Sequence, residues 1–262
     1  MKRIANSKSA TKLRALLMAV VLSFSALGAS TAQSGETTIA VAANFTDAAK
    51  QIGAAFARET GHKAIFSFGS TGQFYAQIGQ GAPFEIFLAA DQARPEKALE
   101  EGLAVSGSRI TYAIGRIVLF SRDKDLVTGK ETLMSGDVTR VAIANPVTAP
   151  YGAAAVEAMQ ALGVYDALSA KLVKGTNIAQ AYQFVATGNA EIGFVAFSQI
   201  ANHDEGSRWL VPAEFHTPIP QDAVLLKKGQ GNEAARAFME FLMGPESKAI
   251  KEKYGYGAGD SA

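Results

Sequence analysis

Residues 67–91 read SFGSTGQFYAQIGQGAPFEIFLAAD, and this stretch contains a complete passage from strand to helix to strand. It starts at the end of an apolar strand over 62–69, continues as a helix over 73–79, and finishes in a nearly continuously apolar strand over 84–91. Strands that are buried on both faces of a parallel sheet have this continuous apolar character. The stretch therefore predicts a β-α-β unit whose turn is formed by Gly69, Ser70, Thr71 and Gly72.

The same alternation of strand and helix continues on both sides of this stretch. Further strands are predicted over 37–43, 139–146, 170–176 and 190–198, and the helices between them over 44–61, 94–102, 151–163 and 177–188. The alternation breaks near residue 112 and then restarts. Repeated β-α-β units with such a break predict an α/β protein with two lobes.

Two extended segments are expected to join the lobes. One is a single long strand over 112–122, and the other is the segment 209–226, whose three prolines are typical of a crossing or edge segment. We therefore expect lobe I to comprise residues 33–112 plus about 226–262, and lobe II to comprise 113–225. The helices predicted over 233–255 would pack back on lobe I.

The N-terminal 32 residues have the pattern of a cleavable signal peptide. Five basic residues and no acid precede an apolar run over 15–27, and the small residues Ser30, Thr31 and Ala32 follow it. The alternative is a membrane anchor, but the run is shorter than the roughly 20 residues that span a bilayer. We expect export, with cleavage after Ala32 and a soluble, periplasmic mature protein.

Charge and cysteine content limit the function further. The whole chain has 25 Lys and Arg against 24 Asp and Glu, so loss of the five basic residues of the signal peptide leaves 20 against 24, a net charge of −4. A mildly acidic exported protein is a poor candidate for binding nucleic acid. The chain has no cysteine, so no disulfide can stabilise it and the apolar core must do so.

Four junctions between a strand and the following helix share small, polar residues. They are 43–47, 69–72, 145–152 and 175–178. Ligands of α/β sheets bind at the carboxyl ends of strands, where helix N-termini offer unpaired N–H groups. Each junction alone can be explained as a helix cap, with Asn44 capping the first helix and Asp47 three residues on. Two such junctions in each lobe nevertheless favour an anion site in a cleft between the lobes.

The absence of certain residue types from these junctions limits the kinds of ligand that they can bind. None of the junctions contains Lys or Arg, and the turn 69–72 contains no carboxylate to accept a proton from the ligand. This lining suits a tetrahedral dianion that carries no proton. Without a lysine the turn is no P-loop, and it does not have the G-x-S-x-G pattern of a nucleophile. The three histidines, His62, His203 and His216, are isolated and form no metal motif.

With these residues in view, the chain resembles the periplasmic molybdate-binding proteins, the substrate-binding subunits of molybdate ABC transporters. The resemblance covers residues 38–256. It is carried by AVAANFTDAAKQI, VAIANPVTAPYGAAAVEAMQALG, AEIGFVAFS, FLMGPESKAIKEKYG and, most specifically, GAPFEIFLAAD at 81–91. It implies the type II fold of periplasmic binding proteins, with two α/β lobes hinged by two crossing strands and an oxyanion held between them by backbone N–H groups and hydroxyls.

The resemblance also implies the binding residues. The first contact with the anion is often a serine in this family, and here it falls on Asn44. The second contact is a hydroxyl that falls on Thr71, with Ser70 beside it. The third contact falls on Tyr151, and the fourth is the backbone amide of Ile178. Some members use a tyrosine where this chain has Ala196. Our hypothesis is that Tyr151 supplies that hydroxyl instead.

The expected function is the capture of molybdate, and of tungstate, by a monomer that delivers the anion to a membrane permease without any cofactor. One alternative is another tetrahedral oxyanion, such as sulfate, bound on the same scaffold. A more distant alternative is an exported α/β hydrolase that uses Ser70 or Thr71, which requires a base within hydrogen-bond reach.

Overall fold

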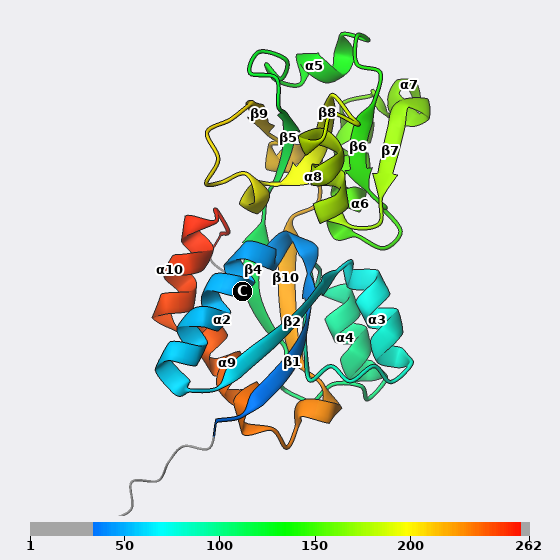
Figure 1. Cartoon of the computed structure of the whole chain (residues 1–262). Coiled ribbons are helices and arrows are strands. Elements are labelled where there is room, and N and C mark those ends of the chain that lie inside the picture. The colour runs from blue at the N-terminus through cyan, green and yellow to red at the C-terminus, as the bar shows by residue number, and fades with distance from the viewer. Residues whose placement is uncertain (1–33, 258–262) are drawn as a thin grey trace, which may run out of the picture. The chain divides into compact units, whose positions relative to one another are not determined.

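The computed structural model describes residues 34–257. The predicted signal peptide lies outside the described residues. Within 34–257 there are two five-stranded sheets, with helices packed against both, and this confirms the expected α/β fold with two lobes (Figure 1). None of the helices within these residues has the length and apolar character needed to cross a membrane.

The sheet of lobe I has the strand order β2-β1-β3-β10-β4. Strands β2, β1 and β3 run parallel, while β10 is antiparallel to both of its neighbours. The strands are β1 (Glu36–Ala42), β2 (Lys63–Gly69), β3 (Ile86–Leu88), β4 (Ile110–Gly115) and β10 (Ile219–Leu225). The helices of this lobe are α2 (Thr46–Thr60), α3 (Thr71–Gly79), α4 (Ala93–Glu100), α9 (Glu233–Met243) and α10 (Pro245–Lys253), with the 3-10 helices η1 (Ala43–Phe45) and η5 (Lys227–Gly229).

The sheet of lobe II repeats this arrangement in the order β7-β6-β8-β5-β9. Strands β7, β6 and β8 are parallel, and β5 is antiparallel to β8 and β9. The strands are β5 (Ile117–Ser121), β6 (Val141–Ala144), β7 (Leu172–Gly175), β8 (Ile192–Ala196) and β9 (Ser207–Leu210). The helices are α5 (Glu131–Met134), α6 (Pro150–Ala161), α7 (Tyr165–Leu168) and α8 (Ile178–Ala186), with the 3-10 helices η2 (Ser169–Lys171), η3 (Phe197–Gln199) and η4 (Ala213–Phe215).

The inner strands of each sheet are buried on both faces, as the continuously apolar runs predict, whereas the edge strands β2, β7 and β9 are partly exposed. Successive side chains of a strand point to opposite faces, so Ile39 and Val41 pack with α2 and α9, whereas Ala40 packs with α3 and α4. Figure 1 shows these two groups of helices on either side of the sheet of lobe I. This burial fixes the strands and therefore fixes the positions of the loops at their carboxyl ends.

The crossings between the lobes differ in detail from the prediction. The single strand expected over 112–122 is divided at Arg116, because β4 pairs in the first sheet and β5 in the second. The chain returns through residues 216–218, and β10 already belongs to the sheet of lobe I although we expected 113–225 to lie in lobe II. The extended segment 209–226 has no turn signal that would show where it changes sheets.

Capping at two junctions follows the prediction and at one it does not. Ser70 caps α3 and Asn177 caps α8, since their side chains accept hydrogen bonds from Gln73 N and Gln180 N. Asn44 does not cap α2: the N-cap is Phe45, which makes no side-chain cap. The expected reciprocal role of Asp47 is therefore wrong as well, and Asp47 instead forms an exposed ion pair with Lys50 at 3.6 Å.

Candidate functional site

The four predicted junctions meet at one small cavity between the lobes. Its volume is about 10 Å³, and all five predicted binding residues line it. The complete lining is Ala42, Ala43, Asn44, Gly69, Ser70, Thr71, Ala90, Ala149, Pro150, Tyr151 and Ile178. Clefts that bind organic ligands measure roughly 300–1,000 Å³, whereas this cavity has room for about one water molecule, so a tetrahedral oxyanion would enter it only when the lining residues move apart.

The lining of the cavity contains no charged side chain. An anion there would be held by neutral donors and by the positive ends of helix dipoles, in surroundings that screen little. The environment is the one that the sequence predicted from four junctions without Lys or Arg and from a turn at 69–72 without a carboxylate.

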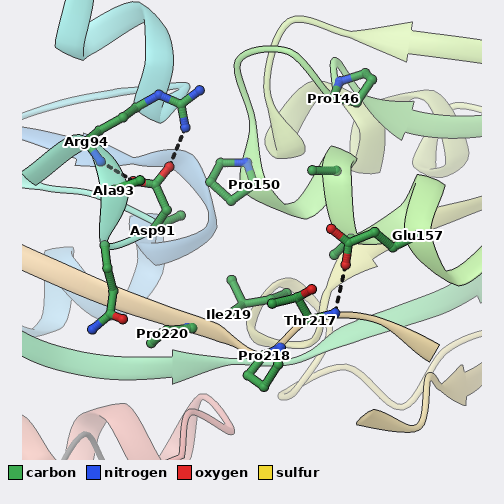
Figure 2. A pocket seen from close by; sticks show the side chains of 14 residues that line it. Asp91, Ala93, Arg94, Pro146, Pro150, Glu157, Thr217, Pro218, Ile219 and Pro220 are labelled. Atoms are coloured by element: carbon green, nitrogen blue, oxygen red, sulfur yellow. Dashed lines mark hydrogen bonds and ion pairs between the residues drawn. The ribbon is translucent and has the colours of Figure 1, made fainter. Parts of the chain in front are cut away.

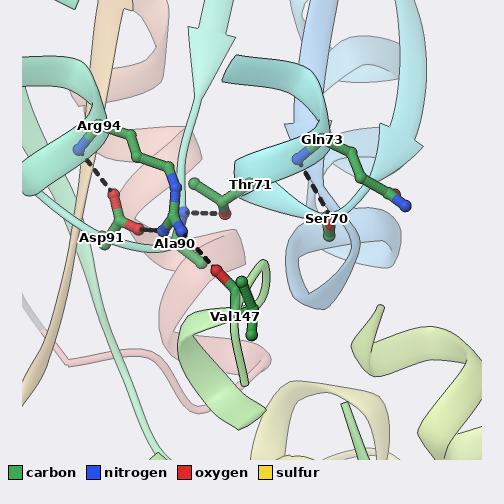
Figure 3. Close-up of polar contacts among 7 residues, drawn as sticks. All are labelled: Ser70, Thr71, Gln73, Ala90, Asp91, Arg94 and Val147. Atoms are coloured by element: carbon green, nitrogen blue, oxygen red, sulfur yellow. Dashed lines mark hydrogen bonds and ion pairs between the residues drawn. The ribbon is translucent and has the colours of Figure 1, made fainter. Parts of the chain in front are cut away.

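The two hydroxyls at the start of α3 accept hydrogen bonds from backbone N–H groups (Figure 3). Ser70 Oγ accepts a hydrogen bond from Gln73 N at 3.3 Å, and Thr71 Oγ1 accepts one from Ala90 N at 3.0 Å. Each oxygen is therefore used as an acceptor by the protein, while its O–H can still donate to a ligand. Both side chains are buried, so their positions are fixed.

Backbone N–H groups add further donors. Thr71, Tyr151 and Ile178 stand in the first turns of α3, α6 and α8, and their N–H groups have no acceptor among residues 34–257. Neighbouring N–H groups are already bonded, for example Gln180 N to Asn177 Oδ1 at 3.0 Å. The unpaired first-turn groups of both lobes are thus placed where an anion would need them.

Asn44 is buried at the cavity, but its side-chain N–H groups are both used inside the protein. Nδ2 donates to Gln221 Oε1 at 2.9 Å and to Tyr256 Oη at 3.0 Å. The carbonyl oxygen of Asn44 accepts from Tyr256 Oη at 2.7 Å and from Ser198 Oγ at 2.8 Å. A donor contact from Asn44 to a ligand would have to come from its backbone, not from its amide side chain.

Tyr151 reaches the cavity from α6 in lobe II and is 2% exposed. Its Oη accepts a hydrogen bond from Gln221 Nε2, on strand β10 of lobe I, at 3.1 Å. Burial raises the pKa of the Tyr151 hydroxyl well above its ordinary value, so the proton is retained at neutral pH. A Cβ on Gly115 would come within 2.2 Å of this hydroxyl, which explains the glycine at the end of β4.

Ala196 ends strand β8 and is buried, but it does not line the cavity. Its backbone N–H donates to Gln199 Oε1 at 2.9 Å. The tyrosine hydroxyl at the cavity in this chain is therefore the one on Tyr151.

Direct hydrogen bonds join the two lobes beside the cavity. Gly72 N donates to Thr148 O at 2.9 Å, and Arg94 Nη2 donates to Val147 O at 3.0 Å (Figure 3). Arg94 also forms an ion pair with Asp91 in its own lobe. Arg94 lies beyond strand β3, outside the four junctions, so the strand-end pattern does not predict its contact with lobe II.

A larger pocket of about 350 Å³ adjoins the cavity and shares Ala90 and Pro150 with it (Figure 2). Asp91 and Arg94 line it from lobe I, and Glu157 lines it from lobe II. The Glu157 carboxylate accepts a hydrogen bond from Thr217 N, in the returning crossing segment, at 2.7 Å. Its two carboxylates distinguish this pocket from the uncharged cavity.

Catalytic and metal chemistry find no support in the part of the chain that the structure describes. No group of three or more His, Asp or Glu side chains there could hold a metal ion. Neither Ser70 nor Thr71 is hydrogen-bonded to a His, Asp or Glu side chain in residues 34–257. The base that a hydrolase would need is thus not next to either hydroxyl.

Comparison with known proteins agrees with this geometry. Residues 37–257 match the family model described as bacterial extracellular solute-binding protein. The molybdate-binding protein ModA of Rhodobacter capsulatus is 56% identical over 86% of this chain and 89% of its own length. ModA of Azotobacter vinelandii is 51% identical over 86% of this chain and 91% of its own length.

Solved structures give the same result. The periplasmic molybdate-binding protein of Azotobacter vinelandii superposes with a TM-score of 0.82 and 39% identity, covering 84% of this chain and 98% of that one. The sulfate-binding protein SubI of Mycobacterium tuberculosis has a TM-score of 0.70 but only 12% identity, covering 87% of this chain and 88% of that one, and so shares the fold alone. The family is one of solute-binding proteins and not of enzymes, which confirms the expectation that this chain is no enzyme. By identity, coverage and fold, the chain belongs to the periplasmic molybdate-binding proteins, within the bacterial extracellular solute-binding protein family.

Proposed function

We propose that this protein binds molybdate, and tungstate in the same way, in the small cavity between its lobes. The observation that carries the proposal is an uncharged cavity with unused O–H and N–H donors from both lobes. The relatives named as molybdate-binding proteins support molybdate as the ligand. An anion that bonds to both lobes favours the conformation in which the lobes are together, so binding is coupled to hinge closure.

The hydrogen bonds already made within the protein indicate which groups remain free to donate to an anion. The hydroxyls of Ser70 and Thr71 would donate from lobe I, and the hydroxyl of Tyr151 together with the backbone N–H of Ile178 would donate from lobe II. Asn44 would contribute through its backbone, because both side-chain N–H groups are already bonded. These groups would replace the water molecules around the anion without adding a charge.

The cellular role follows from the family. We propose that the exported protein acts as a monomer in the periplasm and delivers its anion to the membrane permease of an ABC transporter. The basic, apolar and small-residue pattern of residues 1–32 supports export.

Thermal melting of the purified protein with molybdate, tungstate, sulfate or phosphate tests the proposal. A ligand at 1,000 times its Kd adds about 4 kcal/mol of stability. For a protein of this size that shift corresponds to roughly 8–16 °C in Tm. Molybdate and tungstate should both produce it. A Tm that molybdate leaves unchanged would refute the proposal, and a shift with sulfate alone would assign the cavity to sulfate.

A further inference from the structure

A buried amide on strand β10 connects the crossing strands to the candidate site. Gln221 is fully buried, and each end of its amide is hydrogen-bonded. Its Oε1 accepts from Asn44 Nδ2 at 2.9 Å and from Tyr112 Oη at 3.0 Å, and its Nε2 donates to Tyr151 Oη at 3.1 Å. Gln221 is thus bonded within lobe I at one end and to lobe II at the other.

The direction of these hydrogen bonds is determined by a backbone carbonyl. The carbonyl oxygen of Asn44 can only accept, so the hydroxyl of Tyr256 uses its single proton on it, at 2.7 Å. Tyr256 Oη must then accept from Asn44 Nδ2, which identifies that atom as the amide nitrogen. The remaining N–H of Asn44 requires an acceptor, and this places Oε1 of Gln221 toward Asn44 and Nε2 toward Tyr151.

This orientation of the Gln221 amide determines where the hydroxyl proton of Tyr151 can point. Because its oxygen accepts from Gln221, its O–H must point elsewhere, and it has no acceptor among residues 34–257. If the amide were reversed, Oε1 would take that proton and Tyr151 could no longer donate it to a ligand.

The strand pairing explains how Gln221 is held in this position. Gln221 pairs with Ala113 and Asp222 with Thr111, so Tyr112 is an extra residue on β4 at a β-bulge. A bulge redirects the side chains beside it. The Tyr112 hydroxyl contacts Gln221 Oε1 and Ala89 O, both at 3.0 Å, and both are acceptors. The single proton of Tyr112 can serve only one of these two acceptors at a time, so Tyr112 does not decide the orientation of the amide, which rests on the hydrogen bonds through Tyr256 and Asn44.

We propose that Gln221 is a positioning residue for anion binding, which directs the Tyr151 proton into the cavity and does so only when the lobes are together. The inference rests on the proposed function of the cavity. In an open protein the bond between β10 and α6 would be broken, and the Tyr151 hydroxyl would be free to rotate. Closure thus completes the donor set as well as enclosing the anion.

A double-mutant cycle on molybdate affinity tests this inference. The Gln221→Met variant removes the amide at similar volume, and Tyr151→Phe removes the hydroxyl. We expect Gln221→Met to raise the molybdate Kd about tenfold in the wild-type background, the effect of about one lost hydrogen bond. In the Tyr151→Phe background the same change should alter Kd less than about twofold, because the group through which Gln221 acts is absent.

The outcomes separate the two claims. Equal effects of Gln221→Met in both backgrounds would assign Gln221 a merely structural role and overturn the inference, whereas wild-type protein that binds no molybdate would overturn the proposed function itself. If Gln221→Met does not fold, Gln221→Leu replaces it in the cycle, because it also removes the amide and adds no charge that would repel the anion directly. Its effect on Kd should again fall below about twofold when Tyr151 is absent.

Discussion

Arg94 provides a sharp test of whether closure of the lobes is part of binding. Its guanidinium is held by Asp91 in lobe I and donates to the carbonyl oxygen of Val147 in lobe II at 3.0 Å. The Arg94→Met variant keeps the apolar stem and removes only the polar contacts. We expect weaker molybdate binding, because a bond that exists only between closed lobes stabilises the bound state and not the open one.

The magnitude follows from the surroundings of the side chain. A hydrogen bond from a charged donor contributes about 1.5–3 kcal/mol when it is well buried. The Arg94 side chain is 28% exposed, and solvent competes for its N–H groups, so about 1 kcal/mol is a realistic value. That corresponds to a roughly fivefold rise in Kd, and the change should come from a faster dissociation rate.

Stopped-flow kinetics and calorimetry with molybdate measure both quantities. Lys97 supplies the matched control, since it lies on the same helix and its contacts, with Glu101 at 3.8 Å and with the ring of Tyr75 at 5.7 Å from the centroid, are both within its own lobe. The Lys97→Met variant should bind molybdate like the wild type. An Arg94→Met variant with unchanged Kd and dissociation rate would refute the role of this contact in the bound state.

Further predictions concern the cavity and the buried hydroxyls. Tyr151→Phe should raise the molybdate Kd about tenfold or more in calorimetry, the effect of one lost hydrogen bond to an anion. Gly72→Ala should weaken binding roughly tenfold, because its Cβ would lie 3.0 Å from Thr148 Cα across the lobes; Gly79→Ala, with open space at that position, should not. Burial raises the pKa values of Tyr112, Tyr151 and Tyr256 in the folded protein. The folded state therefore binds more protons at alkaline pH, so the free energy of unfolding should stay level below about pH 9 and fall above about pH 10, by up to about 4 kcal/mol per pH unit. Denaturant titrations across this range measure the slope, and a flat profile up to pH 12 would contradict it.

The sequence predicts the elements that local patterns define. Continuous apolar runs identify strands such as the one expected over 84–91, although the strand observed there is only Ile86–Leu88. Small polar residues identify the caps Ser70 and Asn177, which the structure confirms. It does not predict where an extended segment leaves one sheet and enters another, as at Arg116, because strand partners are chosen by tertiary contacts.

The meeting of four strand ends at one cavity was predictable, but the hydrogen bonds of Asn44 and Gln221 were not. Residues at four strand ends were expected at one cleft, and they line one cavity. The role of Asn44 depends on Tyr256 and Gln221, which lie 212 and 177 residues away in the chain, and no local pattern can show such contacts. Gln221 itself is a polar residue in an extended segment, a pattern that more often indicates an exposed position.

The hydrogen bonds within the protein also bear on which anions the cavity favours. Ser70, Thr71 and Tyr151 each accept one N–H from the protein, which uses part of the acceptor capacity of each oxygen and leaves its proton free to donate. The cavity lining contains no carboxylate that could accept a hydrogen bond from a ligand. An anion that retains a proton, such as hydrogen phosphate, would have to leave its own donor poorly satisfied, which costs about 1–3 kcal/mol. A fully ionised anion incurs no such cost, so phosphate should raise Tm much less than molybdate at equal concentration. Discrimination against protonated anions would then follow from a lining that offers many donors and no carboxylate acceptor.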